Sequence, residues 1–180
     1  MKTYSWKEAF DDAYRAAEAG SPRSQNFVGY CYDIGKGVRR DPKKARFWIQ
    51  KAAEQGYLEA IFNLGLMNDL GQGMPADPVR AFELYMEAAN RGHLQAQANL
   101  AIALLDGVGV EQNLNKGIYW LRRAARRGDE KSQYNLGRAY LDGEGVSRSE
   151  SRARTWLSKA AASKHSKAKA LLKRLEKAVA

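Results

Sequence analysis

One spacing dominates the sequence, because many positions carry the same or a similar residue every 36 residues. Glycine shows the spacing most clearly, in three columns that each recur in four successive copies. These columns are Gly20, Gly56, Gly92 and Gly128; Gly35, Gly71, Gly107 and Gly143; and Gly37, Gly73, Gly109 and Gly145. A fixed period of this length is typical of a tandem array, in which each unit buries its apolar face against its neighbours.

Each repeated unit predicts two helices joined by a turn. In the second repeat, apolar residues recur at helical spacing between residues 60 and 70, and Gly71–Gly73 follows as a helix-ending turn. Asp77–Pro78 then combines an N-cap residue with proline at the first helical position. The second helix is expected to end at Gly92. Gly117 stands where the other second helices have alanine, and we expect it to cost its helix about 1 kcal/mol.

The repeat therefore predicts an all-α fold of four complete helix-turn-helix units with a half repeat at each end. We expect one domain over residues 1–180. Its parts are a half repeat at 4–20, repeats at about 24–56, 60–92, 96–128 and 132–164, and a closing helix at 165–178. The closing helix has leucines on one side and lysines on the others, which is the polar outer face that a terminal repeat needs.

Composition excludes several classes of protein. Cys31 is the single cysteine, so the chain has no intramolecular disulfide and no cysteine-based zinc site. No run of about 18 apolar residues is present to span a membrane. The charged start of the chain lacks the apolar core of a signal peptide, and we expect a cytoplasmic protein.

The repeated motif resembles the Sel1-like repeat, a relative of tetratricopeptide repeats. In the second repeat it reads Ala60-x-x-Asn63-Leu64-Gly65, then Gly71-x-Gly73, Asp77-x-x-x-Ala81 and Ala88-Ala89-x-x-Gly92. The resemblance covers about residues 5–175 and implies a right-handed α/α superhelix. It also implies an adaptor or scaffold for proteins or peptides, a role often met in bacteria. A cysteine-rich branch of the family is linked to β-lactam handling, but this chain lacks the paired cysteines of that branch.

Similarity with tetratricopeptide grooves implies that the first helix of each pair lines a concave, partner-binding face. On this sequence that face consists of Arg23, Asn26, Tyr30, Asp33, Glu59, Phe62, Leu66, Asp69, Gln95, Asn99, Ile102, Lys131, Tyr134, Asn135 and Arg138. The repeating asparagines Asn63, Asn99 and Asn135 either tie one helix to its neighbour or hold a bound peptide. Phe62 and Tyr134 either anchor a partner or pack between units.

Signals for catalysis are weak. His93 and His165 have no companions at metal-ligand spacing, and we expect His93 to be a surface residue in a turn. Ser166 and Lys169 have the spacing of a penicillin-binding nucleophile without its partner motifs. Cys31 occupies a core-type column and is expected to be a buried, inert thiol. We predict a non-enzyme that needs no cofactor or metal.

The net charge of +10 is concentrated near the C-terminus. Residues 1–115 hold 13 basic and 14 acidic residues, whereas residues 116–180 hold 17 and 6. The predicted basic patch consists of Arg122, Arg123, Arg126, Arg127, Arg152, Lys169 and Lys173. Such asymmetry suits an acidic protein partner, nucleic acid or a merely solvated face, and we expect no membrane insertion. We predict a protein- or peptide-binding scaffold, with nucleic-acid binding and β-lactam hydrolysis as the alternatives.

Overall fold

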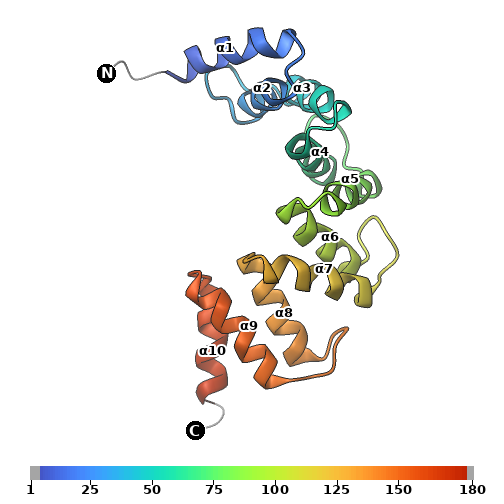
Figure 1. Ribbon diagram of the computed structural model, residues 1–180, viewed down its shortest axis with the longest axis vertical. Coiled ribbons are helices and arrows are strands. Elements are labelled where there is room, and N and C mark those ends of the chain that lie inside the picture. Colours follow the sequence, from blue (N-terminus) through green and yellow to red (C-terminus); the bar gives the residue numbers. More distant parts are fainter. Residues whose placement is uncertain (1–4, 178–180) are drawn as a thin grey trace. The chain divides into compact units, whose positions relative to one another are not determined.

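Residues 5–177, which the computed structural model describes, form ten α-helices and no strand (Figure 1). The helices are α1 (Trp6–Glu18), α2 (Pro22–Ile34), α3 (Pro42–Glu54), α4 (Leu58–Leu70), α5 (Pro78–Asn90), α6 (Leu94–Asp106), α7 (Leu114–Arg126), α8 (Glu130–Asp142), α9 (Glu150–Ala162) and α10 (Ser166–Lys177). The all-α fold class and the pairing of helices are thereby confirmed. Residues 4 and 178, which the predicted terminal half repeats include, lie outside the described residues.

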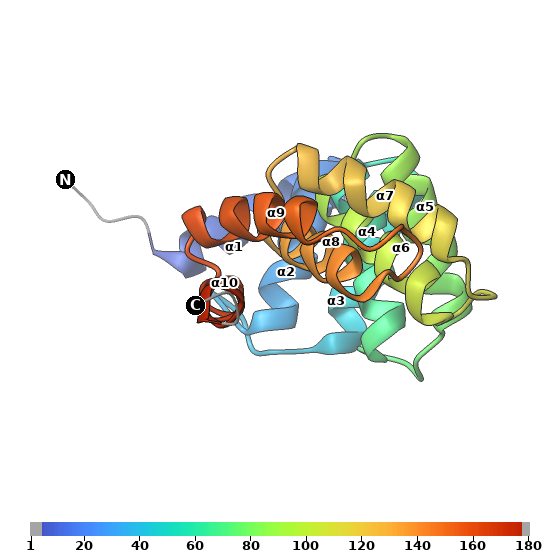
Figure 2. The same cartoon turned by 90° about the horizontal axis from the view of Figure 1, so that it is seen from below.

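The helices group into two compact units, the first ending at His93 and the second beginning at Leu94. Within each unit, every helix packs on the helix that follows it, α1 to α5 in the first and α6 to α10 in the second. The neighbours α8 and α9, for example, lie side by side in two perpendicular views (Figures 1 and 2). In the second unit, Ala168 of α10 is buried and Leu171, Leu172 and Leu175 pack around it, as the closing helix was expected to do.

The predicted caps begin the second helix of every pair. The Asp77 carboxylate accepts a hydrogen bond from the backbone N–H of Arg80 at 2.9 Å, and the Asn113 side chain accepts one from Lys116 at 2.9 Å. Asp41 and Ser149 cap α3 and α9 in the same way. These contacts satisfy N–H groups that the first turn of a helix leaves without a partner.

The two glycines of each Gly-x-Gly turn have different roles. The first, such as Gly71 with φ of 67°, adopts the left-handed conformation that ends the helix. The second lets the turn approach the preceding repeat. A Cβ on Gly73 would lie 2.6 Å from the Pro42 carbonyl oxygen, and one on Gly145 would lie 2.9 Å from Ile118 Cγ1. The turns are therefore packing elements and not loops that bind phosphate.

Glycine also sits inside the helices, where two of them come close together. A Cβ on Gly117 of α7 would lie 2.7 Å from both Cγ and Cδ2 of Leu105 on α6. The expectation that this glycine only weakens its helix is therefore incomplete, because its missing side chain makes room for Leu105. In the other three pairs the glycine is on the first helix instead, as at Gly137, where a Cβ would lie 2.7 Å from Leu157 Cγ.

Buried glutamines connect one repeat to the next. The Gln25 side-chain amide donates to the Ala17 carbonyl at 3.1 Å, and Gln133 donates to the Ala125 carbonyl at 3.1 Å. In both cases the first helix of a pair is tied to the end of the helix before it, through a carbonyl that also accepts a hydrogen bond from the backbone N–H of Gly20 or Gly128. Cys31 is fully buried, as predicted, and its burial raises the pKa of the thiol.

Candidate functional site

In the first unit, the predicted partner-binding face lies on α2 and α4 and is mostly accessible to solvent. Arg23, Tyr30, Glu59 and Asp69 are exposed, and Asn26, Asp33 and Leu66 are half-buried. Asn63 Nδ2 donates to Asn26 Oδ1 at 3.0 Å, so this asparagine ties α4 to α2. The structural reading of the asparagine column is thus confirmed at Asn63.

Phe62 is the exception on this face, because it is only 8% exposed. Its ring stacks on the imidazole of His93 with centroids 4.4 Å apart and also contacts Tyr85. The prediction that Phe62 is displayed to a partner is wrong, and the ring does not pack between repeats either, because it contacts Tyr85 of the same helix pair and His93 in the turn that ends this pair. The surface position predicted for His93 is wrong for the same reason, since His93 is also 8% exposed and its Nε2 lies 3.1 Å from Glu59 Oε2.

The second unit repeats this aromatic–histidine contact. Tyr134 of α8 stacks on His165 with centroids 4.6 Å apart, and the backbone N–H of Ala168 donates to His165 Nδ1 at 3.2 Å. Both histidines therefore have structural partners. The sequence contains a signal for these pairs, because Phe62 to His93 and Tyr134 to His165 span the same number of residues in the same phase of the repeat.

A pocket of about 240 Å³ lies on α6 and α8 of the second unit, and we call it the α6–α8 groove. It is lined by Ile102, Leu105, Asp106, Asn135, Arg138, Ala139 and Glu144. Three of these, Ile102, Asn135 and Arg138, belong to the predicted face, so the fold brings them together. Ile102 is 37% exposed, and the Arg138 guanidinium is 3.9 Å from the Asp142 carboxylate.

The remaining predicted residues of the second unit lie on the same two helices but outside this pocket. Gln95 and Lys131 are exposed, and Asn99 is half-buried. Within residues 5–177 the side chains of Asn99 and Asn135 have no hydrogen bond like that of Asn63 to Asn26. Asn135 lines the groove, and its side chain has no hydrogen-bond partner among the described residues. Its role in holding a bound peptide therefore stays a prediction.

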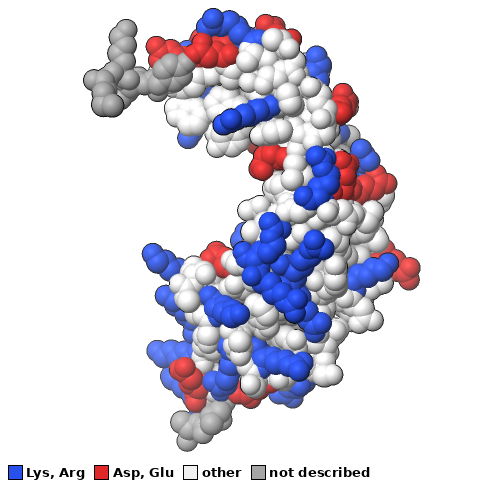
Figure 3. Space-filling model, viewed as in Figure 1, with Lys and Arg blue, Asp and Glu red and all other residues white. Residues whose placement is uncertain are grey.

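The predicted basic patch covers three helices of the second unit. Figure 3 shows Lys and Arg side chains gathered over α7 and α9. Arg122 of α7 and Arg152 of α9 lie over the Tyr140 ring, 5.9 and 5.7 Å from its centroid. Lys169 and Lys173 are exposed on α10. Positive charge thus continues from one helix to the next on this unit.

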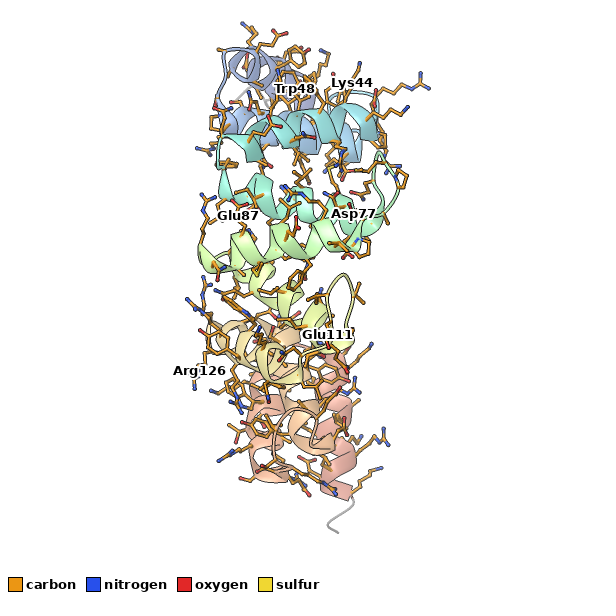
Figure 4. All side chains as sticks on the ribbon, turned by 90° about the vertical axis from the view of Figure 1, so that its right-hand side faces the viewer. Lys44, Trp48, Asp77, Glu87, Glu111 and Arg126 are labelled. Carbon is orange, nitrogen blue, oxygen red and sulfur yellow. The ribbon has the colours of Figure 1, made fainter. Side chains whose placement is uncertain are left out.

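The arginines Arg122, Arg123, Arg126 and Arg127 also line a second pocket, of about 510 Å³, together with Asn115 and Tyr119. Arg126 extends from the end of α7 away from the ribbon (Figure 4). Sequence reasoning found the arginines but missed Tyr119, which is 56% exposed beside them. The signal for it was present, because Tyr119 stands one turn before Arg123 on the same helix face.

Among the described residues, no group of histidine, cysteine or carboxylate side chains is arranged to hold a metal ion. No helix within residues 5–177 has both the length and the apolar character that crossing a bilayer requires.

Comparison with known proteins gives four consecutive matches to the family model described as Sel1 repeat, at residues 22–57, 58–93, 94–129 and 130–165. A Sel1 repeat protein from Oxalobacter formigenes is 34% identical with a TM-score of 0.84, over 94% of this chain and 49% of that one. A protective antigen with an SLR fold from uropathogenic Escherichia coli is 38% identical with a TM-score of 0.83, over 86% of this chain and 33% of that one.

Among curated proteins, a chitin synthase regulator of Saccharomyces cerevisiae is 50% identical over 46 residues, which is 26% of this chain and 7% of the regulator. The chain thus spans less than half the length of each of these three relatives. The two structural relatives are bacterial, and their likeness covers nearly all the helices of both units.

Proposed function

The chain belongs to the Sel1 repeat family, and we propose on that premise that it is a non-catalytic scaffold whose first helices bind a protein or peptide. Proteins built from Sel1 repeats generally serve as scaffolds for protein interactions. In such arrays the repeating positions maintain packing, whereas exposed positions that differ between units are available for recognition. A single continuous domain and a cytoplasmic location stay predictions of the sequence.

The main support for this proposal is the composition of the α6–α8 groove. It combines an exposed apolar side chain, Ile102, with the guanidinium of Arg138 and the amide of Asn135. Arginine is one of the residue types that most often anchor interfaces, an exposed isoleucine offers apolar contact area, and an asparagine amide both donates hydrogen bonds to and accepts them from a peptide backbone. Asp106 and Glu144 at the same groove favour a segment that carries some basic or amide groups there.

In the first unit, the corresponding face offers Tyr30 of α2, which is 44% exposed, and the exposed charged residues Arg23 of α2 and Glu59 of α4. Tyrosine provides apolar contact area together with a hydroxyl group, which suits a partner-binding position. Phe62 does not belong to the proposed contact surface, because His93 covers its ring. The positive charge of the second unit would speed encounter with an acidic partner rather than define the groove's specificity.

Affinity purification followed by quantitative mass spectrometry tests the proposal. The tagged chain and a variant with Ile102→Ala and Arg138→Ala are compared in lysate of the source organism. We expect specific partners to be recovered with the wild type and reduced roughly tenfold with the variant, since each lost anchor costs about 1 kcal/mol or more. The matched control is Val108→Ala with Arg148→Ala, which removes an exposed apolar residue and an arginine elsewhere in the second unit.

Partner recovery must be unchanged in this control, and both variants must keep the wild-type circular dichroism spectrum. Equal recovery with the wild type and with the Ile102→Ala, Arg138→Ala variant would exclude the groove as the binding surface. Variants of Phe62 are unsuitable for this test, because loss of a buried aromatic side chain costs about 3–5 kcal/mol of stability.

A further inference from the structure

One face of α7 brings several arginines together with an exposed aromatic residue, Tyr119. Asn115, Tyr119, Arg122, Arg123 and Arg126 recur at spacings of one to four residues and line the pocket of about 510 Å³. We call these five residues the α7 arginine face. It lies on a second helix, whereas the α6–α8 groove is formed by first helices, so the two surfaces are separate.

The guanidinium groups on this face are held by uncharged partners. Arg122 Nη2 donates to the Tyr140 hydroxyl at 3.1 Å, and Arg123 Nη1 donates to the Tyr119 hydroxyl at 3.3 Å while lying over the Trp120 ring. In the described part of the chain, no carboxylate comes within salt-bridge distance of Arg122, Arg123 or Arg126. The arginines are therefore oriented, but their charge is not neutralised and most of their donors stay available.

The equivalent helix of the preceding repeat shows what has changed. On α5, Arg80 pairs with Glu83 at 2.6 Å and Arg91 pairs with Glu87 at 3.4 Å. One repeat later, Tyr119 stands at the position of Glu83 and Arg123 at the position of Glu87. The same two positions hold Phe47 and Lys51 on α3 and Thr155 and Lys159 on α9, so the neutralising carboxylates are particular to α5. What is particular to α7 is the group of arginines around an exposed tyrosine.

The arginines of this face also repel one another within the helix. Arg122 and Arg126 are four residues apart, and a like-charge pair at this spacing destabilises a helix. The helix dipole offsets part of the repulsion, but only in the last turn. A cluster of oriented cations without counter-charges is what a site for an anionic ligand requires, because the ligand's charge removes the repulsion.

We propose that the α7 arginine face binds an acidic segment of a protein partner, with neighbouring carboxylates on Arg122, Arg123 and Arg126 and an apolar side chain on Tyr119. The proposal rests on the scaffold function and adds a second binding surface to it. Carboxylates match the fork of a guanidinium, and the exposed tyrosine ring supplies contact area for a nearby apolar residue.

The size of the face favours a peptide over nucleic acid. Tyr119 to Arg126 covers two helical turns, about 10 Å along the axis, which matches roughly three residues of extended peptide. Sequence-independent binding of single strands instead uses charged grooves that follow the backbone over about 4–16 nucleotides. The family's role as a scaffold for protein interactions supports the same choice.

Fluorescence anisotropy with a defined probe tests this site. The probe is a fluorescein-labelled octapeptide of glutamates around one central tryptophan, and the reference peptide has glutamine in place of every glutamate. We expect the glutamate probe to bind and the glutamine peptide not to bind. The double variant Arg123→Gln, Arg126→Gln should bind the probe roughly tenfold or more weakly, because each substitution removes a charge-assisted contact.

The control variant, Arg148→Gln with Lys167→Gln, removes the same charge from exposed positions of the second unit. We expect it to weaken binding less than about threefold, as loss of general attraction does. A variant with Arg123→Lys and Arg126→Lys keeps the charge but not the fork, and should lie between the two.

Three results would overturn the proposal. They are absence of probe binding at low salt, an equal loss of probe affinity in the control variant, and tighter binding of a thymidine dodecamer than of the probe, with the dodecamer's binding abolished by the same Arg→Gln substitutions. The Ile102→Ala, Arg138→Ala variant should bind the probe as the wild type does. If the probe fails to bind while that variant still loses its partners from lysate, this inference fails and the scaffold function stands.

Discussion

The exchange of glycine and alanine in the third helix pair leads to a prediction about stability. At two facing positions, three pairs have glycine on the first helix and alanine on the second, as in Gly137 and Ala153. The third pair has the reverse order, Ala101 and Gly117. If each pair needs one glycine at the helix contact, then Gly117→Ala should destabilise the protein and Ala101→Gly should rescue it.

The magnitudes follow from the contacts at Gly117. A Cβ there would lie 2.7 Å from Leu105 Cγ and 3.2 Å from the Leu105 backbone nitrogen, so either the side chain or the helix must move. Overpacking of this kind costs about 1–3 kcal/mol, against about 1 kcal/mol gained from replacing glycine within a helix. We expect Gly117→Ala to lower the free energy of unfolding by about 1 kcal/mol.

The rescue has a template in the fourth pair. Leu141, the equivalent of Leu105, packs in the same apolar cluster as Ala153, and Gly137 stands on the first helix there. Ala101→Gly alone removes a fully buried methyl group and a good helix former, at a cost of about 1–2 kcal/mol. The double variant should be within about 0.5 kcal/mol of wild type, since it reproduces the order found in the other pairs.

Urea denaturation followed by far-UV circular dichroism measures the free energy of unfolding of the four proteins in this cycle. The expected signature is a coupling of about 2 kcal/mol between the two substitutions. If the free energy of unfolding of the double variant instead falls by the sum of the two single losses, a glycine on the first helix does not substitute for one on the second, and the reasoning is refuted.

Two further predictions follow from buried polar groups. Gln133→Ala should lower the free energy of unfolding by about 0.5–1.5 kcal/mol, because it removes the buried hydrogen bond that ties α8 to the Ala125 carbonyl, which still accepts from the Gly128 N–H. The matched control is exposed Gln95→Ala, and equal losses would show that this hydrogen bond does not stabilise the protein. Burial raises the pKa of the Cys31 thiol above its ordinary 9.0, so the folded state keeps a proton that the unfolded state loses there. Stability should therefore fall as the pH rises past about 9, and the fall should be smaller in Cys31→Ala when urea denaturation is repeated across that range.

The helices and their caps were predictable because they depend on local chemistry. The Asp77 side chain caps the start of α5, and Gly71, which has no side chain, adopts the left-handed conformation that ends α4. Such signals can be read without knowing any distant contact. The same period also placed Ile102, Asn135 and Arg138 on one face, and the structure brings these three to one pocket.

The burial of His93 was not predictable in the same way. Its column also holds Tyr57 and Asp129, and a variable column of polar residues indicates a surface. The position is instead where a turn passes over the first helix of the same repeat, so its residue either caps a helix or covers an aromatic ring. Asp129 does the first, accepting from the Ser132 N–H at 2.7 Å, and His93 does the second on Phe62.

The comparison of α5 with α7 shows how a repeat protein separates packing from recognition. Both helices bury alanines at the same two positions, Ala88 and Ala89 in one and Ala124 and Ala125 in the other, so the framework that holds them is unchanged. Their outer faces differ, since the ion pair of Arg91 with Glu87 has become a pair of arginines. A cation at the position of Arg123 packs on a tryptophan in three of the four repeats, since Lys51, Arg123 and Lys159 lie over Trp48, Trp120 and Trp156. What is particular to α7 is the group of arginines around the exposed Tyr119. The α7 arginine face is thus a better indicator of a partner than the net charge of +10, to which every solvated lysine of α10 also contributes.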